Sequence, residues 1–420
     1  MDNITHSLVG LACAEAITAI KPELRKYSRP ILLASLIANN LPDLDFAYTR
    51  ITTSASGERI GQILHHRGHT HTLAFALPGA AILAALLRWL SGFKSLKSLN
   101  APFGVLFFAA ALGISTHVFA DSWNNYGVHP FWPFWNSWIY GDSLFIVDPL
   151  IWAIGLPFAY FRFSSKFVRA LIFTLLGGLL YLMVQYRATH WGSVALWLVS
   201  VVVSFKLWRN WFQGHRQQST AWVLVLLLIP VFFLRSFSIS MDQRTRLWLR
   251  HAFGTTVLDV SLTPLPLNPF CWTGTSVETD RTDYVARRFT VAFASWLVPA
   301  SLCPSIFSSA KFTADLKPVT QSKALEFEKA GLFQWVGETR LPLERLRSFY
   351  DHNCEFSAVM KFYRVPFIKR QGAGQWIVGD LRYDRSEGRD FPEMIINDPP
   401  GKCPRFVPNW TPPREDLLKR

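Results

Sequence analysis

Apolar residues gather in long runs along the first half of the chain, up to about position 233, and are more evenly spread after position 235. A helix needs about 20 mainly apolar residues to cross the hydrocarbon core of a membrane. Runs that approach or reach this length lie at 72–90, 101–120, 143–161, 167–186 and 191–207, with a short, strongly apolar one at 220–234. Weaker segments at 4–20 and 30–41 could be shorter helices sheltered by their neighbours. The pattern predicts an α-helical polytopic membrane protein with about six to eight transmembrane helices.

The second half has the mixed pattern of a soluble domain. Residues 252–270 are rich in Pro, Thr and Leu and predict an extended connection. Strand-like stretches at 290–297, 354–365 and 375–383 mix β-branched and aromatic residues, Gly372–Gly374 predicts a hairpin turn, and 323–329 a short helix. We therefore expect a small α+β or mostly β extracytoplasmic domain. The predicted divisions are a membrane domain at 1–234, a connecting segment at 235–270 and the soluble domain at 271–420.

Basic residues outnumber acidic ones, 43 to 29, for a net charge of +14. In the first half they lie in short gaps between apolar runs, as in membrane proteins, so no nucleic-acid partner is expected. If all eight runs cross, the gaps at 21–29, 88–100, 162–169 and 206–218 share one side and hold 13 Lys and Arg, against 4 on the other side. Because positive residues favour the cytoplasm, the N-terminus and the C-terminal domain are expected to face outward.

The cysteines agree with an outward-facing domain. Cys13 lies in the first apolar segment, whereas Cys271, Cys303, Cys354 and Cys403 all fall in the C-terminal domain. Four cysteines allow three pairings, and we expect at least one disulfide there.

Metal-ligand residue types gather near the ends of the predicted helices. Seven of the eleven histidines lie within the first 129 residues, and this stretch also holds Asp43, Asp45 and Asp121. Under the topology above, four separate segments bring His and Asp residues to the outer membrane face. His117 and Asp121 are four residues apart, so both side chains share one helix face. Each motif alone could be an ordinary hydrogen-bonded pair, a polar loop or a helix stop, but their convergence favours a divalent metal site, with zinc as first candidate and manganese as alternative.

Four motifs carry a family resemblance. In chain order they are Asp2-Asn-Ile-Thr-His-Ser7, Asn40-Leu-Pro-Asp-Leu-Asp45, His66-Arg-Gly-His-Thr-His-Thr72 and His117-Val-Phe-Ala-Asp121. This order resembles the bacterial membrane-bound metal-dependent hydrolases of the YdjM-like family, over about residues 1–150. It is also loosely similar to the zinc-dependent phospholipase C group, which would imply phosphoester chemistry. The chain lacks a second His-x-x-x-Glu unit, so a complete three-metal site is not expected.

The resemblance implies a hydrolase in the bacterial inner membrane, with its chemistry at the outer face. The implied metal ligands are His6, one or both of Asp43 and Asp45, His66, His71, His117 and Asp121. A carboxylate that is not a ligand, Asp43 or Asp45, could act as general base, and Arg67 could contact an anionic group such as a phosphate. The expected partners are membrane lipid and a lipid-like ester or phosphoester substrate.

Two other readings stay open. A transporter would bind its transported metal at the cluster, but transporters place ionisable residues near the membrane midplane, and only Glu15 and Asp148 fit that position. A noncatalytic scaffold would hold a purely structural metal. The aromatic loop at 121–142, which has no Lys or Arg, predicts either an interfacial anchor or a lid over a lipid-like substrate. The pattern leaves the oligomeric state open.

Overall fold

The computed structural model describes residues 1–49, 60–185, 191–214, 222–266, 268–304, 312–388 and 390–419. The chain divides into two compact units. The helical unit comprises Met1–Leu44, Arg67–Trp135 and Ile139–Arg235, and the mixed unit comprises Asp45–His66, Asn136–Trp138 and Ser236–Arg420.

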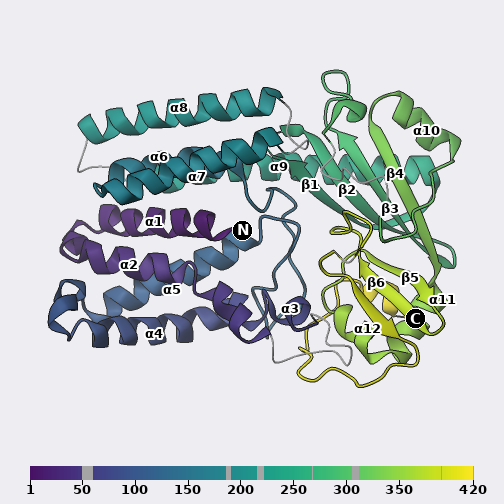
Figure 1. Cartoon of the computed structure of the whole chain (residues 1–420), viewed down its shortest axis with the longest axis horizontal. Helices are drawn as coiled ribbons and strands as arrows, with labels where there is room; N and C mark the ends of the chain where they lie inside the picture. Colours follow the sequence, from purple (N-terminus) through teal and green to yellow (C-terminus); the bar gives the residue numbers. More distant parts are fainter. Residues whose placement is uncertain are drawn as a thin grey trace. The chain divides into compact units, whose positions relative to one another are not determined.

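The helical unit is built of helices that run alongside one another (Figure 1). Short connections join α1 to α2, α4 to α5 and α6 to α7, whereas longer segments separate α2 from α4 and α5 from α6. Its helices are α1 (Asn3–Ile20), α2 (Ser28–Ala38), α4 (Leu73–Leu90), α5 (Phe103–Asp121), α6 (Pro149–Arg162), α7 (Lys166–Gln185), α8 (Trp191–Gly214) and the first part of α9 (Trp222–Phe253). Short 3-10 helices include η1 (Pro22–Tyr27), η2 (Pro42–Ala47), η4 (His69–His71) and η5 (Lys94–Leu99).

Six helices of the described ranges are long and apolar enough to cross a membrane. They are α1, α4, α5, α7, α8 and the part of α9 at Val225–Phe253. The weaker segment at 30–41 forms α2, and the run at 143–161 forms α6, with 11 and 14 residues. At 1.5 Å per residue these two helices are about 17 and 21 Å long, shorter than a hydrocarbon core of about 30 Å. The prediction of a helical, multi-pass membrane protein is therefore confirmed.

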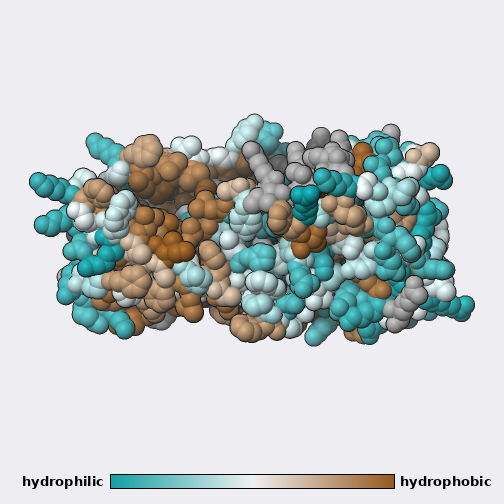
Figure 2. Space-filling model, turned by 90° about the horizontal axis from the view of Figure 1, so that it is seen from below, coloured by the Kyte–Doolittle hydropathy of each residue, from teal (hydrophilic) through white to brown (hydrophobic). Residues whose placement is uncertain are grey.

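Large apolar side chains point outward from these helices, as expected for surfaces in contact with lipid. Exposed examples occur on α4, α7, α8 and α9: Leu77, Ile82, Phe167, Phe173, Leu182, Val199, Val202, Leu207, Ile229 and Phe232. In the view of Figure 2, hydrophobic residues gather in the left half. A water-exposed protein rarely shows so large a continuous apolar surface.

Two glycines let α1 and α5 come into close contact with α2. A Cβ atom added at Gly113 of α5 would lie 2.7 Å from the Cβ of Ala38 on α2, and one added at Gly10 of α1 would lie 2.8 Å from the carbonyl oxygen of Ser35. Both helices therefore close on α2 only because these positions lack a side chain. This close packing places Asn39, the residue after α2, beside the end of α5.

The mixed unit is an α+β domain, as predicted (Figure 1). Its described residues form an antiparallel four-stranded sheet in the order β1-β2-β3-β4, from β1 (Thr256–Leu265), β2 (Asn268–Asp280), β3 (Asp283–Ala292) and β4 (Phe333–Pro342). They also form a three-stranded sheet of β5 (Pro366–Gly372), β6 (Gln375–Asp380) and β7 (Met394–Asn397). The helices are α3 (Ile60–His65), α10 (Ser322–Lys329), α11 (Leu343–His352), α12 (Cys354–Val359), α13 (Glu415–Leu418) and the 3-10 helix η6 (Ala300–Leu302).

Several local predictions in this unit can be compared with the structure. The helix at 323–329 and the turn at Gly372–Gly374 are confirmed by α10 and by the β5–β6 hairpin. The extended connection at 252–270 is wrong, because these residues include the end of α9, all of β1 and the start of β2. The strand at 354–365 is also wrong: its first half is α12, whose start is capped by the Asn353 side chain accepting from the backbone N–H of Phe356 at 3.0 Å.

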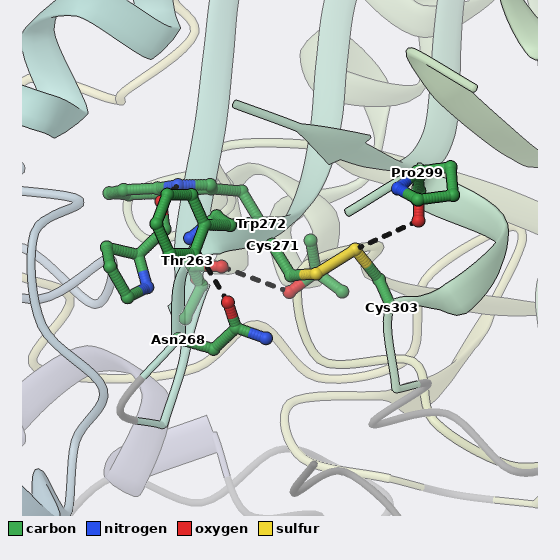
Figure 3. The surroundings of a disulfide bond; sticks show 9 residues. Thr263, Asn268, Cys271, Trp272, Pro299 and Cys303 are labelled. Atoms are coloured by element: carbon green, nitrogen blue, oxygen red, sulfur yellow. Dashed lines mark hydrogen bonds between the residues drawn. A yellow bond between two sulfur atoms is a disulfide. The ribbon is translucent and has the colours of Figure 1, made fainter. Parts of the chain in front are cut away.

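The four cysteines of the C-terminal half are paired, which confirms the expectation of at least one disulfide. Cys271 is bonded to Cys303, and Cys354 to Cys403. The first bond joins β2 to the segment that follows η6, and Figure 3 shows Trp272 beside Cys271 and Pro299 beside Cys303. The remaining cysteine, Cys13, is buried in α1.

Candidate metal centre

Four side chains of the helical unit bring possible ligand atoms within 4.8 Å of one another: Asp43, His71, His117 and Asp121. We call them the metal-ligand group. Asp43 follows α2 on η2, His71 ends η4 just before α4, and the other two lie on the last turns of α5. The hydroxyl of Thr72 caps α4 by accepting from the backbone N–H of Phe75 at 3.2 Å, which orients the preceding turn. Three separate segments thus supply the group.

The distances within the group match the spacing of ligands around one small cation. The two Nε2 atoms of His71 and His117 are 3.1 Å apart. Asp121 Oδ2 lies 3.3 and 3.4 Å from them, and Asp43 Oδ1 lies 3.3 and 3.7 Å from them. A tetrahedral zinc with bonds of about 2.0–2.1 Å keeps its ligand atoms about 3.3 Å apart.

The hydrogen bond of His117 indicates which ring nitrogen carries the proton. Its Nδ1 lies 2.7 Å from the backbone carbonyl oxygen of Asn39. A carbonyl only accepts, so Nδ1 donates and Nε2 is the ring nitrogen that faces the group. Two imidazoles and two carboxylates directed at one point repel each other unless a cation lies between them. The donor set therefore fits a divalent metal, and both zinc and manganese accept these ligand types.

Each carboxylate presents one oxygen to the group and the other to supporting residues. Asp43 Oδ2 accepts from Asn3 Nδ2 at 3.0 Å. Asp121 Oδ1 accepts from Arg67 Nη2 at 2.8 Å and from the amino group of Met1, and it lies 3.3 Å from His6 Nε2. Such outer contacts orient metal ligands and affect metal affinity.

Arg67 is held on several sides within the helical unit. Besides Asp121, its guanidinium donates to Asn124 Oδ1 at 3.0 Å and lies 4.5 Å from the ring centre of Tyr126. The residue is only 2% exposed and adopts a φ of 58°, which is unusual for a residue other than glycine. These contacts favour a positioning role over the predicted contact with an anionic substrate.

The other predicted ligands lie outside the metal-ligand group. His6 is fully buried, and its ring stacks on that of His117 with centroids 3.8 Å apart. Asp45 and His66 belong to the mixed unit, where His66 Nδ1 lies 3.0 Å from Asp45 Oδ1 and the His66 ring stacks on Phe46. Within the helical unit, His6 therefore contacts two members of the group and is not one of the four clustered ligand residues.

Asp43 differs from the other members of the group in its access to solvent. Its side chain is 13% exposed, whereas those of His71, His117 and Asp121 are at most 1% exposed. Burial acts to raise the pKa of Asp43, but the hydrogen bond with His71 and the charge of His117 outweigh it and hold the pKa below its usual range. Nearby, burial lowers the pKa of His129 to about 3, with repulsion from His71 adding to the effect. His129 is therefore neutral at physiological pH.

An apolar pocket of about 110 Å³ lies among α1, α5, α6 and α9 of the helical unit. It is lined by Val9, Thr116, Phe119, Trp123, Ile151, Leu227 and Leu228. Thr116 precedes His117, and its hydroxyl accepts from Asn39 Nδ2 at 2.8 Å. The pocket wall and the metal-ligand group are thus connected through α5 and Asn39.

Comparisons with known proteins cover the part of the chain that holds the group. Residues 1–192 match the family model described as YdjM inner membrane protein. The uncharacterized protein YfhP of Bacillus subtilis (strain 168) is 27% identical over 154 residues, which are 36% of this chain and 43% of YfhP. The chain thus matches less than half the length of that relative, and no solved structure matches it. The matched residues 1–192, a little under half of the chain, contain all four members of the metal-ligand group.

Proposed function

We propose that this protein is a membrane-bound metal-dependent hydrolase, with a divalent metal held by His71, His117 and Asp121. The proposal rests on the distances between the ligand atoms of these three residues. The Nε2 atoms of the two histidines and Oδ2 of Asp121 lie 3.1–3.4 Å from one another. A bound zinc would lower the pKa of a water to about 7 and polarise the carbonyl or phosphoryl oxygen of a substrate.

Asp43 is the residue to which we assign the role of general base. It is the partly exposed member of the group, so water can reach it, and Asn3 holds its second oxygen at 3.0 Å. A catalytic zinc keeps one position open beside three protein ligands, whereas a structural zinc is bound by four. If Asp43 instead serves as a fourth ligand, the centre is structural and the protein is a scaffold. Asp45 remains the second candidate for the base.

The substrate that fits best is an ester or phosphoester of a lipid-like molecule. The apolar pocket lies among membrane-spanning helices and is smaller than an engineered cavity of about 150 Å³ that binds benzene, so it suits a short length of hydrocarbon. Exposed aromatic residues of the loop at 121–142, including Phe131, Phe134 and Trp135, suit the membrane interface. Two disulfides and the distribution of Lys and Arg support placing the chemistry at the outer face of a bacterial inner membrane, with the C-terminal domain in the periplasm.

The two acidic residues that would favour a transporter have structural partners. Glu15 Oε1 accepts from Arg162 Nε at 2.5 Å, and Asp148 Oδ1 accepts from the backbone N–H of Leu150 at the start of α6. An acidic residue that carries ions across a membrane has to exchange its partners, whereas these two tie helices together or cap them. This arrangement favours the hydrolase.

Metal content and hydrolysis measured together test the proposal. Detergent-purified wild type should contain stoichiometric zinc or manganese and hydrolyse members of a panel of nitrophenyl esters, phosphodiesters and fluorescent phospholipids. The double variant His117→Ala/Asp121→Ala should lose both the metal and the activity. The same substitutions at the exposed pair Asp351 and His352 on α11 are a matched control and should change neither.

Asp43→Asn separates the hydrolase from the scaffold. As a general base, Asp43 can be replaced with retention of metal and loss of turnover. Loss of metal in Asp43→Asn, with no hydrolysis by the wild type, would instead identify a closed structural centre. Equal trace metal in the wild type and the double variant would overturn the metal centre itself.

A further inference from the structure

A pocket of about 440 Å³ in the mixed unit is lined largely by charged side chains. It lies among β4, the start of α11 and the β5–β6 hairpin, and its size is that of a small-molecule site. The lining residues that carry the argument are Lys317, Arg340, Arg345, Lys369, Arg370 and Trp376.

Positive charge in this pocket is only partly neutralised. The lining contains five cations but only two acids, Asp315 and Glu338. Arg340 pairs at 3.1 Å with Glu338, and at the same distance with Asp280 beyond the lining. Within the described ranges of the chain, Lys317, Arg345 and Lys369 form no ion pair. A concave surface with an excess of one charge attracts ligands of the opposite charge.

The Trp376 ring contacts two of the cations. The guanidinium of Arg345 lies 4.6 Å from the centre of its ring, and that of Arg370 lies 5.9 Å away. The ring is supported by an edge contact with Phe349 at 5.1 Å, and Phe349 is buried. Stacking on an aromatic ring restricts a guanidinium without using its N–H donors. Arg370 Nε donates to the carbonyl oxygen of Gly372 at 3.5 Å, and its other N–H groups stay available to a ligand.

We propose that this pocket binds a phosphate group, presented either by a phospholipid headgroup or by a soluble phosphate ester. The planar donor fork of arginine matches the oxygens of a phosphate, and the two lysines add point charges. The proposal concerns the C-terminal domain and needs no metal, so it stands apart from the proposed hydrolase.

Calorimetric titration of the full-length protein in detergent tests the proposal and separates the two sources. Inorganic phosphate and glycerol phosphate report a soluble ligand, and dihexanoyl phosphatidic acid, compared with dihexanoyl phosphatidylcholine, reports a lipid headgroup. Binding of any phosphate monoester probe to the wild type, with dihexanoyl phosphatidylcholine bound at least about tenfold more weakly, is the expected result.

Charge-neutralising variants locate the binding. Arg345→Gln/Arg370→Gln should weaken binding by about tenfold or more, because both changes remove charge-assisted hydrogen bonds. Lys323→Gln/Arg405→Gln removes the same charge at exposed positions of the same unit outside the pocket and should change affinity less than about twofold. Both arginines of the pocket are exposed, so the fold should tolerate their replacement. Equal weakening by the two pairs, or no binding of any probe to the wild type, would overturn the proposal.

Discussion

Asn3 offers a test of the metal centre that leaves all four members of the metal-ligand group in place. This exposed residue at the start of α1 donates to Asp43 Oδ2 at 3.0 Å and to Asn40 Oδ1 at 3.3 Å. The cap of α1 is supplied by Asp2, whose side chain accepts from the backbone N–H groups of Ile4 and Thr5. Replacing Asn3 by alanine should therefore free one oxygen of Asp43 without harming the helix.

The size of the effect follows from that single hydrogen bond. A hydrogen bond to a charged group contributes about 1.5–3 kcal/mol, and the exposure of Asn3 favours the lower end. About 1.4 kcal/mol corresponds to a factor of about ten in an equilibrium constant. Asp43 is the assigned general base, so loss of the hydrogen bond that positions its carboxylate should lower turnover and leave the metal in place. We expect Asn3→Ala to lower turnover by about tenfold and to retain the metal.

Turnover of the substrate panel in detergent, measured beside the metal content, reports this effect directly. Asn100→Ala is the matched control, because Asn100 is an exposed asparagine whose side chain bonds to the charged Arg88, also at 3.0 Å. Asn100 lies just before α5, whereas His117 and Asp121 lie at the end of that helix, so turnover should stay as in the wild type. Equal turnover in the two variants would refute the idea that Asn3 positions the general base Asp43.

Three further predictions concern packing, covalent structure and pH. Gly113→Leu should lower both the melting temperature and the metal content, because an added Cβ would lie 2.7 Å from α2. In the control Gly104→Ala, on the same helix, the added Cβ meets no atom within 4 Å, so neither quantity should change. Removing the Cys354–Cys403 bond, which spans 49 residues, should cost the mixed unit about 4 kcal/mol in chemical denaturation. Burial raises the pKa of Glu393 to about 8, so the stability of the folded unit should fall as pH rises from about 4.5 through about 8. Glu393→Gln should remove this loss of stability, which is on the order of a few kcal/mol. Hydrogen exchange of β5–β7 measures it.

The helical architecture could be predicted because lipid imposes a length and a composition on each helix. The same reasoning predicted that His71, His117 and Asp121 lie on one side of the membrane. When successive helices cross in opposite directions, the end of one helix and the start of the next lie on the same side. α2 and α6 show where this reasoning weakens, because helices of 11 and 14 residues are too short to give a clear signal. Their packing against longer helices depends on contacts far apart in sequence.

The supporting residues could not be predicted from ligand chemistry. Asn39 acts through its backbone carbonyl, which any residue type would provide, and it reaches His117 because α2 packs against α5 at Gly113. Asn3 lies within the first motif, but its role depends on the distance to Asp43. Helix α12, the first half of the predicted strand at 354–365, was mistaken for β structure for a similar reason: its sequence has β-forming residues, and the cap at Asn353 starts a helix instead.

The choice between Asp43 and Asp45 shows most clearly why spacing alone was insufficient. Both aspartates lie on η2, a 3-10 helix, in which each residue turns the chain by about 120°, so positions two apart face different directions. One aspartate of the pair can therefore face a given group while the other faces elsewhere, and the sequence does not state where the turn begins. The structure brings Asp43 within 3.3 Å of His71 Nε2 and pairs Asp45 with His66. Asp43→Asn and Asp45→Asn should accordingly differ, with turnover lost in the first variant and retained in the second.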